Sequence, residues 1–499
     1  MSAQPADLPQ SVSFQLNGRD TVAHAGESIL QAAQRQGIEI PHLCYTEGLR
    51  ADGNCRACMV EIDGERVLVP SCCRAPTAGM KVSSESARAR HVQKMALELL
   101  PSDIAGSGDY TPHSELAAWS SRLGVGTPRF PRRSQPTADL THPATAVNLD
   151  ACIQCTRCVR ACREEQANDV IGYAGRGAAA LIVFDLDDAM GESSCVACGE
   201  CVQACPTGAL MPANEVGLRD ADKCVDSVCP YCGVGCQLTY HVTDNRTLFV
   251  EGRDGPANHS RLCVKGRYGF DYVSHRQRLT KPLVRCDDAP KRAELDIDFD
   301  NPLSDFREAG WEEAMQRASG GLRSIRDAHG QIALAGFGSA RGSNEEAYLF
   351  QKLVRTAFGS NNVDHCTCLC HASSVAAMLQ MIGSGAVSNP VADVSEAEVV
   401  VLIGSNPTEN HPVAATFFKN AARAGKTLIV LDPRRTAISR FADHVLQFKP
   451  DTDVAMLNAI IHSVIAQGLA DEQFIAQRTE GFAALKAHLA DYSPEAMAP

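Results

Sequence analysis

The chain has 499 residues, of which 44% are hydrophobic, so it is long enough for roughly three or four domains with buried cores. Its 47 basic and 59 acidic residues give a net charge of −12, which argues against nucleic acid as a general partner. No run of about 18 apolar residues occurs, so we expect no membrane span and no direct membrane insertion.

The 22 cysteines fall well below the density of a disulfide-stabilised miniprotein, and most of them stand at short, fixed spacings. Thiolates at such spacings are typical ligands of iron-sulfur clusters, which need a reducing compartment. The first residues carry no charged, apolar or twin-arginine export signal. We therefore expect a cytoplasmic protein.

The first predicted domain covers residues 1–85. An alternating strand over 12–16, a turn at Asn17–Gly18 and a strand near 21–23 precede a helix over 28–36, which ends at Gly37. Four cysteines follow with the spacing C-x10-C-x2-C-x13-C: Cys44, Cys55, Cys58 and Cys72. Four thiolates of this kind suit a [2Fe-2S] cluster, and four structural cysteines in a core are the alternative.

This segment resembles the ferredoxin-like domain, of β-grasp type, at the N-terminus of two kinds of protein. They are the large iron-sulfur subunit of respiratory NADH dehydrogenase and the NAD-dependent formate dehydrogenases. The resemblance implies one [2Fe-2S] cluster on the four cysteines. Cys73 is adjacent to a ligand and is interpreted as a bystander.

Residues 86–146 are predicted to be a helix followed by a proline-rich linker. The spacing of Val92, Met95, Ala96 and Leu99 predicts an amphipathic helix over 88–100 that packs against a core. Four prolines and three arginines between 124 and 146 predict a connection between domains that is either ordered by contacts or flexible.

Residues 147–215 contain two runs of cysteines, each with the spacing C-x2-C-x2-C-x3-C. This is the pattern of a two-cluster bacterial ferredoxin, in which the fourth cysteine of each run serves the other cluster. Zinc is the alternative, although such runs suit two tetrahedral sites poorly. The sequence therefore predicts one [4Fe-4S] cluster on Cys152, Cys155, Cys158 and Cys205, and a second on Cys195, Cys198, Cys201 and Cys162.

A further domain is predicted over residues 222–280, with cysteines spaced C-x2-C-x3-C-x26-C: Cys229, Cys232, Cys236 and Cys263. Gly233 and Gly235 allow the backbone to wrap closely around a cluster. The segment resembles the [4Fe-4S] domain that opens the catalytic part of molybdopterin oxidoreductases. In that family a lysine placed like Lys265 lies between the cluster and the pterin; a solvated surface lysine is the alternative.

Residues 281–499 are predicted to form a doubly wound α/β domain that is incomplete at its C-terminus. Apolar runs predict strands at 331–336, 399–403 and 427–431, with helices over 344–358 and 412–424. Strand, helix and strand at this spacing imply a parallel sheet, so the fold class is multidomain, α+β followed by α/β.

The sequence His365-Cys366-Thr367-Cys368-Leu369-Cys370-His371 precedes a helix start of small residues. It resembles the molybdenum or tungsten ligand site of formate dehydrogenases, which implies that Cys370 ligates the metal and that His371 accepts a proton or stabilises charge there. A buried thiol beside a satisfied histidine is the alternative. Cys368 stands where that family usually carries an arginine.

Two loops follow predicted strands, at 404–412 and 432–436. Loops at the carboxyl ends of parallel strands bind nucleotide-like ligands. By resemblance to formate dehydrogenases, we expect contacts to a molybdopterin guanine dinucleotide from Gly404, Ser405, Asn406, Asn410, His411, Asp432, Arg434 and Thr436.

The resemblance as a whole is to the catalytic alpha subunit of NAD-dependent formate dehydrogenases. It implies one [2Fe-2S] and three [4Fe-4S] clusters with a molybdenum (or tungsten) bis-molybdopterin guanine dinucleotide. It also implies formate as substrate and a beta subunit that carries FMN and binds NAD, with a small iron-sulfur gamma subunit as a further partner. No strand-linked G-x-G-x-x-G stands in this chain, and Phe337–Gly342 is its nearest approach.

Two other interpretations stay open. A nitrate reductase would share a cluster and a cysteine ligand, and a non-catalytic electron-transfer subunit like that of respiratory NADH dehydrogenase would lack the metal. Proteins of the resembling family continue well beyond the position of residue 499, so we expect a fragment or a truncated relative. No residue for formate binding can be named here.

Overall fold

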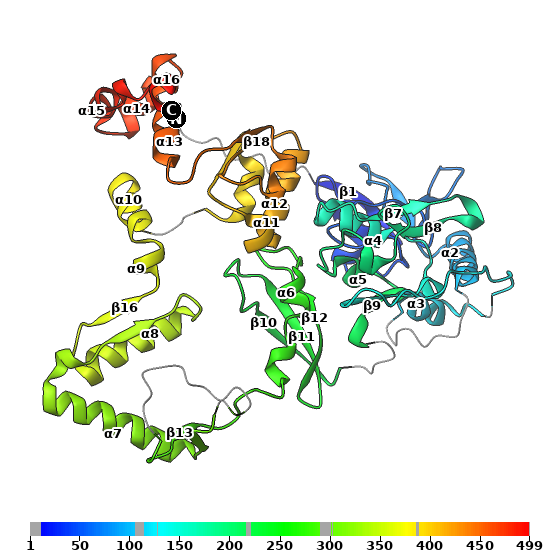
Figure 1. Cartoon of the computed structure of the whole chain (residues 1–499). Coiled ribbons are helices and arrows are strands. Elements are labelled where there is room, and N and C mark those ends of the chain that lie inside the picture. The colour runs from blue at the N-terminus through cyan, green and yellow to red at the C-terminus, as the bar shows by residue number, and fades with distance from the viewer. Residues whose placement is uncertain are drawn as a thin grey trace.

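The structure is a computed structural model that describes residues 11–104, 114–126, 128–215, 221–289, 301, 303–385 and 389–498. The sequence predicts that the first residues carry no export signal. Residues 1–10 lie outside the part of the chain that the structure describes. Figure 1 shows the N-terminal domains gathered on one side and the helices from α7 to α10 on the other. The described chain is therefore a set of domains in succession, which confirms the predicted multidomain fold class.

The N-terminal domain is a five-stranded sheet in the order β2-β1-β5-β3-β4. Strand β1 pairs in antiparallel fashion with β2 and in parallel fashion with β5, and α1 packs on the sheet through Ile29 and Leu30. A capping box between Ser28 and Gln31 starts the helix, and Gly37, with φ +70°, follows its end, as the sequence predicts. The elements are β1 (Val12–Leu16), β2 (Arg19–Ala23), α1 (Ile29–Arg35), β3 (Met59–Ile62), β4 (Val69–Pro70) and β5 (Lys81–Ser83).

Helix α2 (Ala87–Leu99) is present as predicted, but its predicted apolar face is wrong in part. Leu99 is 43% exposed, whereas Gln93 is only 1% exposed. The Gln93 amide can be buried because its Nε2 donates to the carbonyl oxygens of Met59 at 2.9 Å and Ser84 at 3.0 Å. Because Gln93 is polar, its burial could not be recognised from the spacing of apolar residues.

The predicted linker contains a further helix, α3 (Glu115–Leu123), which the proline-rich pattern did not indicate. Leu116 buries it in a core shared with Leu97 of α2. The basic stretch after it is held by contacts, because Arg129 pairs with Glu98 and Arg133 donates to the carbonyl oxygen of Ala180 at 2.7 Å.

The next domain is built from two short helices that each follow a cysteine loop, and from two antiparallel strand pairs. Thr156 (φ +61°) precedes α4 and Gly199 (φ +72°) precedes α5, so the two runs have the same local backbone. The elements are β6 (Thr145–Val147), α4 (Arg157–Arg160), β7 (Ile171–Ala174), β8 (Leu181–Phe184), α5 (Glu200–Ala204) and β9 (Leu210–Pro212).

A three-stranded antiparallel sheet in the order β10-β11-β12 follows, with a one-turn helix after Cys263. Leu238, Val250 and Leu262 form its core with Cys236. The elements are β10 (Lys223–Val228), β11 (Gln237–Thr243), β12 (Arg246–Gly252) and α6 (Val264–Tyr268).

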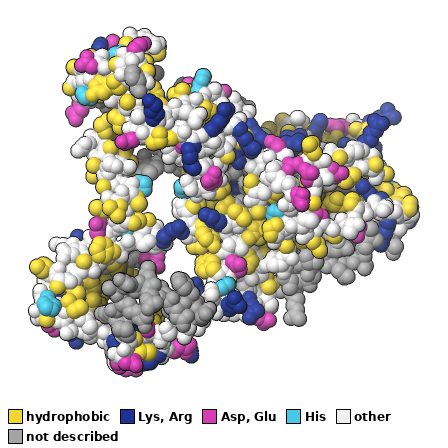
Figure 2. All heavy atoms as spheres, viewed as in Figure 1, with side chains coloured by type: hydrophobic (Ala, Val, Ile, Leu, Met, Phe, Trp, Pro, Cys, Tyr) yellow, Lys and Arg dark blue, Asp and Glu magenta, His cyan; other side chains and the backbone are white. Residues whose placement is uncertain are grey.

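The region from residue 283 to residue 382 is open. None of α7, α8 or α10 has a buried residue, and Trp311 is 72% exposed. Figure 2 shows apolar side chains over this part of the surface. The elements are β13 (Leu283–Arg285), β14 (Phe306–Glu308), α7 (Trp311–His329), β15 (Gly336–Gly338), α8 (Asn344–Lys352), β16 (Val363–His365), α9 (Thr367–Cys370) and α10 (Ala372–Ile382).

The predicted strand at 331–336 is wrong. Residues Gln331–Ala333 form a 3-10 turn, and the strand β15 begins only at Gly336. The predicted helix over 344–358 is present as α8, which continues into a π-helical turn at Leu353–Phe358.

The last region has the predicted strand, helix and strand. Strands β17 (Val399–Ile403), β18 (Thr427–Leu431) and β19 (His444–Leu446) are parallel, and α12 (Pro412–Arg423) connects the first two. This sheet is separate from the parallel pair β15 and β16 within the described ranges. The other elements are α11 (Pro407–Asn410), α13 (Asp453–Ala466), α14 (Glu472–Arg478), α15 (Phe482–His488) and α16 (Pro494–Met497).

Among the helices that the structure describes, none combines the length and the apolar character needed to cross a membrane.

Candidate functional site

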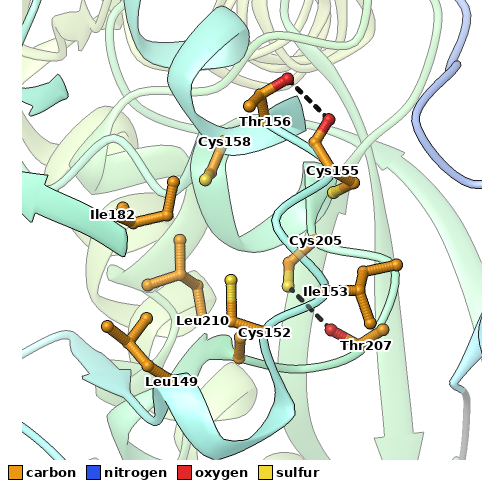
Figure 3. A pocket seen from close by; sticks show the side chains of 11 residues that line it. Leu149, Cys152, Ile153, Cys155, Thr156, Cys158, Ile182, Cys205, Thr207 and Leu210 are labelled. Atoms are coloured by element: carbon orange, nitrogen blue, oxygen red, sulfur yellow. Dashed lines mark hydrogen bonds between the residues drawn. The ribbon is translucent and has the colours of Figure 1, made fainter. Parts of the chain in front are cut away.

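The two cysteine runs of residues 152–205 surround two small cavities. The first has about 360 Å³ of space not filled by atoms, and Figure 3 shows the side chains around it, with Leu149, Ile182 and Leu210 as part of the wall. The second has about 350 Å³. Cys152, Cys155, Cys158 and Cys205 line the first cavity, and Cys162, Cys195, Cys198 and Cys201 line the second. The fourth cysteine of each run thus lies with the other run.

The backbone around both cavities repeats. The N–H of Gln154 donates to Sγ of Cys152, and the N–H of Ala197 donates to Sγ of Cys195, both at 3.4 Å. Gln154 and Ala197 both have positive φ, at 55° and 53°. The left-handed backbone at these two residues turns each loop so that an amide N–H points at a cysteine sulfur. Hydrogen bonds from N–H to sulfur stabilise a metal-bound thiolate.

Charge explains why these thiols fit a metal cluster. Burial, followed by the nearby thiolate charge of Cys205, raises the pKa of Cys155 to about 12. Burial also raises the pKa of Cys158, Cys198 and Cys201 above the usual range. Four thiolates cannot share such a space without compensating positive charge, which bound iron ions would supply.

Within the described ranges, no group of three His, Cys, Asp or Glu side chains is arranged to hold a single metal ion. The thiols line a cavity instead of converging on one point. Two cavities, each lined by four thiols, have the donor set that a multinuclear cluster needs.

The four cysteines of the N-terminal domain also lie together and are buried. The N–H of Cys44 donates to Sγ of Cys55 at 3.4 Å, and the sulfurs of Cys58 and Cys72 are 3.4 Å apart. Hydrogen bonds with Cys55 and Cys72 lower the pKa of Cys44, and the bond to Cys44 is the largest cause that raises the pKa of each partner. Cys73 is exposed, and its Sγ lies 3.6 Å from that of Cys72.

The cysteines at Cys229, Cys232, Cys236 and Cys263 form the fourth group. Gly233 and Gly235, at φ +73° and +87°, give the loop the turns that its glycines predict. Cys229 and Cys263 pack against the buried Cys236. Burial, then the charges of the other three thiolates, raises the pKa of Cys236 to about 12. Helix α6 begins directly after Cys263 and carries Lys265, which is exposed.

Two buried arginines join neighbouring cysteine groups, and sequence reasoning missed both. Arg160 is 3% exposed, and its Nη2 donates to the carbonyl oxygens of Cys44 at 2.5 Å and Cys155 at 3.1 Å. It also pairs with Asp52 at 3.0 Å. One guanidinium therefore bonds to a cysteine of the N-terminal domain and to a cysteine of the first cavity.

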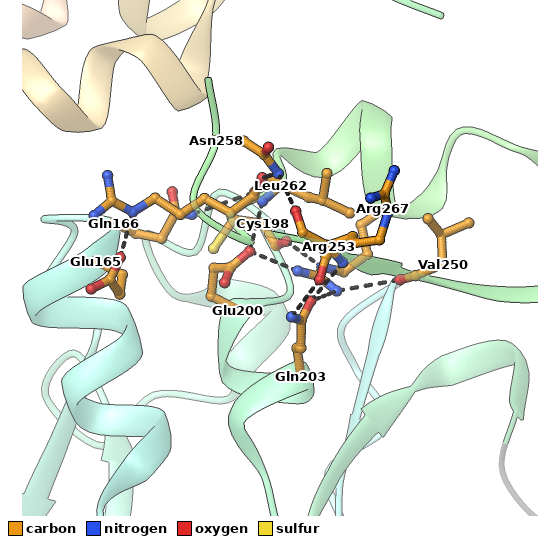
Figure 4. Close-up of polar contacts among 12 residues, drawn as sticks. Glu165, Gln166, Cys198, Glu200, Gln203, Val250, Arg253, Asn258, Leu262 and Arg267 are labelled. Atoms are coloured by element: carbon orange, nitrogen blue, oxygen red, sulfur yellow. Dashed lines mark hydrogen bonds and ion pairs between the residues drawn. The ribbon is translucent and has the colours of Figure 1, made fainter. Parts of the chain in front are cut away.

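The second arginine, Arg267, is also 3% exposed. Its Nε donates to the carbonyl oxygen of Cys198 at 2.8 Å, and its Nη2 pairs with Glu200 at 2.6 Å. Glu200 in turn accepts the N–H of Leu262 at 2.8 Å, as Figure 4 shows. This network fixes the helix after Cys263 against the loop of the second cavity.

The two predicted dinucleotide loops lie side by side at the carboxyl edge of the parallel sheet. The N–H of Gly404 donates to the carbonyl oxygen of Leu431 at 2.9 Å. Asp432 is buried and accepts the N–H of Arg434 at 2.7 Å. Asn406 is buried and accepts the hydroxyl of Thr408 at 2.7 Å.

A polar ligand fits this edge. The buried hydroxyl of Thr436 has no hydrogen-bond partner among the described residues. Gly404, at φ +56°, has open space where a Cβ would point. Ser405 is half-buried, and Asn410, His411 and Arg434 are exposed beside the edge. An unpaired buried hydroxyl and an open turn are what a dinucleotide at such an edge would use.

The structure does not bring the predicted metal ligand to these groups. Cys370 ends α9 and His371 starts α10, and Cys366, Cys368 and Cys370 are all exposed. Figure 1 shows α9 apart from α6 and from the sheet with β18. The described residues therefore leave Cys370 and His371 at a distance from Lys265 and from the dinucleotide loops.

Comparisons with known families match four regions of the chain. Residues 9–87 match the 2Fe-2S iron-sulfur cluster binding domain, and residues 151–209 match the 4Fe-4S dicluster domain. Residues 222–275 match the molybdopterin oxidoreductase Fe4S4 domain, and residues 278–489 match molybdopterin oxidoreductase.

Two similar curated proteins are both named "Putative formate dehydrogenase". One, from Staphylococcus aureus strain MRSA252, is 30% identical over 94% of this chain and 50% of its own length. The other, from Staphylococcus haemolyticus strain JCSC1435, is 31% identical over 92% of this chain and 50% of its own length. The chain thus spans about half the length of these relatives.

Acetylene hydratase from Pelobacter acetylenicus is a similar solved structure. It is 22% identical, with a TM-score of 0.47 over 55% of this chain and 36% of that chain. With its four matched regions in this order, the chain carries the domains of a molybdopterin oxidoreductase with 2Fe-2S and 4Fe-4S domains.

Proposed function

We propose that the chain belongs to the catalytic alpha subunit of an NAD-dependent formate dehydrogenase, which oxidises formate to carbon dioxide, a proton and two electrons. The names of the relatives, 30% and 31% identical, support formate as the substrate. The two cysteine-lined cavities carry the proposal, because clusters bound there would form an electron path that a simple hydrolase or lyase would not need.

In this proposal each cysteine group holds one cluster, so the chain holds one [2Fe-2S] and three [4Fe-4S] clusters. A bound molybdenum or tungsten bis-molybdopterin guanine dinucleotide would supply the two-electron chemistry. Asp432, Thr436 and the turn at Gly404 would hold the dinucleotide at the sheet edge. Cys370 would ligate the metal, and His371 would accept the proton of formate.

The contacts of the two arginines support an order for electron transfer. Electrons would pass Lys265 to the cluster at Cys229 and then cross the Arg267 network to the second cavity. From there they would enter the first cavity and cross the Arg160 contact to the cluster at Cys44. Backbone contacts between ligand loops keep such centres close and fixed.

The electrons would leave to a beta subunit with FMN and NAD, with a small iron-sulfur gamma subunit as a further partner. We propose a separate partner for NAD because this sequence contains no strand-linked G-x-G-x-x-G, which is the dinucleotide-binding motif. Phe337–Gly342 comes nearest to the motif and does not fit it. The cytoplasm is the proposed compartment, since cluster thiolates must stay reduced.

Dye reduction by the anaerobically purified native protein tests the proposal. We expect formate, and not nitrate, to exchange electrons with a viologen dye. Cys370→Ser should abolish formate oxidation and leave the cluster absorbance unchanged, because the cysteine groups lie elsewhere. Cys286→Ser, which changes a thiol outside all four groups, should keep the activity. Full turnover by Cys370→Ser would overturn the ligand assignment, and turnover of nitrate would favour a nitrate reductase.

A further inference from the structure

Cys224 belongs to none of the four cysteine groups, and it is exposed. It lies on β10, which is the edge strand of the sheet β10-β11-β12 and is exposed along its whole length. Its position opposite His241 of β11 is fixed by the strand register. Two chemically active side chains are therefore held face to face by backbone pairing.

The imidazole of His241 connects this thiol to a carboxylate. Sγ of Cys224 is 3.5 Å from Nδ1 of His241, and Nε2 of the same ring is 2.9 Å from Oε2 of Glu251 on β12. Phe249 stacks on the imidazole with ring centroids 4.0 Å apart and an interplanar angle of 9°. Three adjacent strands thus contribute one member each, and the stacked phenyl ring fixes the plane of the imidazole.

This arrangement determines which nitrogen can act as a base. The carboxylate of Glu251 accepts the hydrogen bond of Nε2–H, so Nδ1 is left to accept the thiol proton of Cys224. A thiol, an imidazole and an orienting carboxylate in this order form the arrangement that activates nucleophilic cysteines. The thiolate is the reactive form, and Nδ1 of His241 lies where it can accept the thiol proton as the sulfur attacks.

We propose that Cys224, with His241 and Glu251, is a reactive thiol site for hydroperoxides. The thiolate sulfur attacks one peroxide oxygen, so that an S–O bond forms and the O–O bond breaks. The imidazolium of His241 gives its proton to the leaving oxygen. With hydrogen peroxide the products are a sulfenic acid at Cys224 and water; the sulfur loses two electrons and the peroxide gains them.

Cys366 provides a comparison within the same molecule. It is also exposed and also has a neighbouring histidine, with its Sγ 4.0 Å from Nδ1 of His365. That nitrogen is already engaged by the hydroxyl of Thr367 at 2.6 Å and by the N–H of Thr367 at 3.1 Å. If exposure alone decided reactivity, Cys224 and Cys366 would react with peroxide at equal rates. If the arrangement of Cys224, His241 and Glu251, called the relay below, activates the thiol, Cys224 reacts faster.

The test uses the native, cluster-loaded protein, purified anaerobically and treated briefly with stoichiometric hydrogen peroxide. A dimedone probe traps sulfenic acid, and mass spectrometry of the peptides measures the rate at each cysteine. We expect Cys224 to be trapped at least about tenfold faster than Cys366. Equal rates, or faster trapping at Cys366, would overturn the proposal without any variant that has to fold.

Two charge-removing variants separate the relay from simple electrostatics. Asp226 also lies on β10, where its carboxylate accepts the hydroxyl of Thr239 at 2.7 Å. Removing a carboxylate near a thiol does not hinder a negatively charged nucleophile, so electrostatics alone predicts no slowing of trapping in either Glu251→Gln or Asp226→Asn. The relay predicts slower trapping at Cys224 in Glu251→Gln and no slowing in Asp226→Asn.

His241→Gln should slow trapping at Cys224 by about tenfold and leave Cys366 unchanged, because it removes the base. Unchanged cluster absorbance shows that each variant is folded. Trapping at the wild-type rate in both His241→Gln and Glu251→Gln would contradict the relay. The inference does not depend on formate as the substrate.

Discussion

Single buried charges hold the cysteine groups of this protein together. Arg267 is almost fully buried and makes bonds to Cys198, Gln203, Val250 and Glu200. Gly199 makes this possible, since a Cβ there would lie 2.0 Å from Cδ of Arg267. A buried guanidinium of this kind is stable only while its carboxylate partner and its carbonyl acceptors are in place.

Arg267→Met should therefore destabilise the native protein by about 3–5 kcal/mol, since it leaves the Glu200 carboxylate buried without its partner. The double variant with Glu200→Gln should recover part of this loss. Arg278→Met is a control, because Arg278 is an exposed arginine beyond α6. Urea unfolding followed by circular dichroism under anaerobic conditions measures the change. Equal stability of Arg267→Met and Arg278→Met would contradict a structural role for the ion pair.

The spacing of the cysteines allowed their grouping to be predicted from sequence, down to the exchange of Cys162 and Cys205 between the two runs. Arg160 and Arg267 could not be predicted, because an arginine bonds to carbonyl groups that are distant in sequence and leaves no periodic signal. Gly199, between Cys198 and Glu200, was the one local sign that another chain segment approaches closely.

At the scale of elements, helix α12 joins the parallel sheet to the dicluster domain. Nζ of Lys419 donates to Oδ1 of Asn168 at 3.1 Å, and Nδ2 of Asn420 donates to the carbonyl oxygen of Glu164 at 2.9 Å. Burial, and then the charge of Arg440, lowers the pKa of Lys419. The helix thus places an ammonium group where its charged form is less stable than in water.

The stability contributed by Lys419 should rise with pH. A lowered folded pKa means that the folded state binds fewer protons than the unfolded state, so stability increases as pH rises toward the unfolded value of 10.5. Lys419→Met should remove this increase. Urea midpoints at pH 7.5 and pH 9.5 measure it for both proteins, with the exposed Lys486→Met as control. A steeper pH dependence in Lys419→Met than in the wild type would contradict the assignment.

Elements with strong periodicity or clear caps could be predicted, among them β1, α1, β17, α12 and β18. The strand expected at 331–336 could not, because an apolar run by itself fixes neither burial nor backbone conformation: Gln331–Ala333 form a 3-10 turn, and Ile332 is 83% exposed. The face of α2 was missed at Gln93, whose burial depends on two carbonyl groups in other segments.

At the scale of the whole molecule, the four cysteine groups follow one another in space in the order of the sequence. The core around Leu43 contains Cys44, Cys55 and Cys155 together, so the N-terminal domain and the dicluster domain share one core. The region with Cys370 stands apart, with α7, α8 and α10 exposed (Figure 1). Motif order predicted the succession of domains, whereas the position of Cys370 depends on tertiary contacts that no local pattern specifies.

In the proposed function, this succession of cysteine groups carries electrons from formate. The most direct measurement counts iron, molybdenum and tungsten per chain in the anaerobically purified native protein and follows the cluster spectra as formate is added. We expect about 14 irons and roughly one molybdenum or tungsten per chain, and we expect formate to reduce the clusters. A full complement of iron without either metal, or clusters that formate leaves oxidised, would contradict the proposed function.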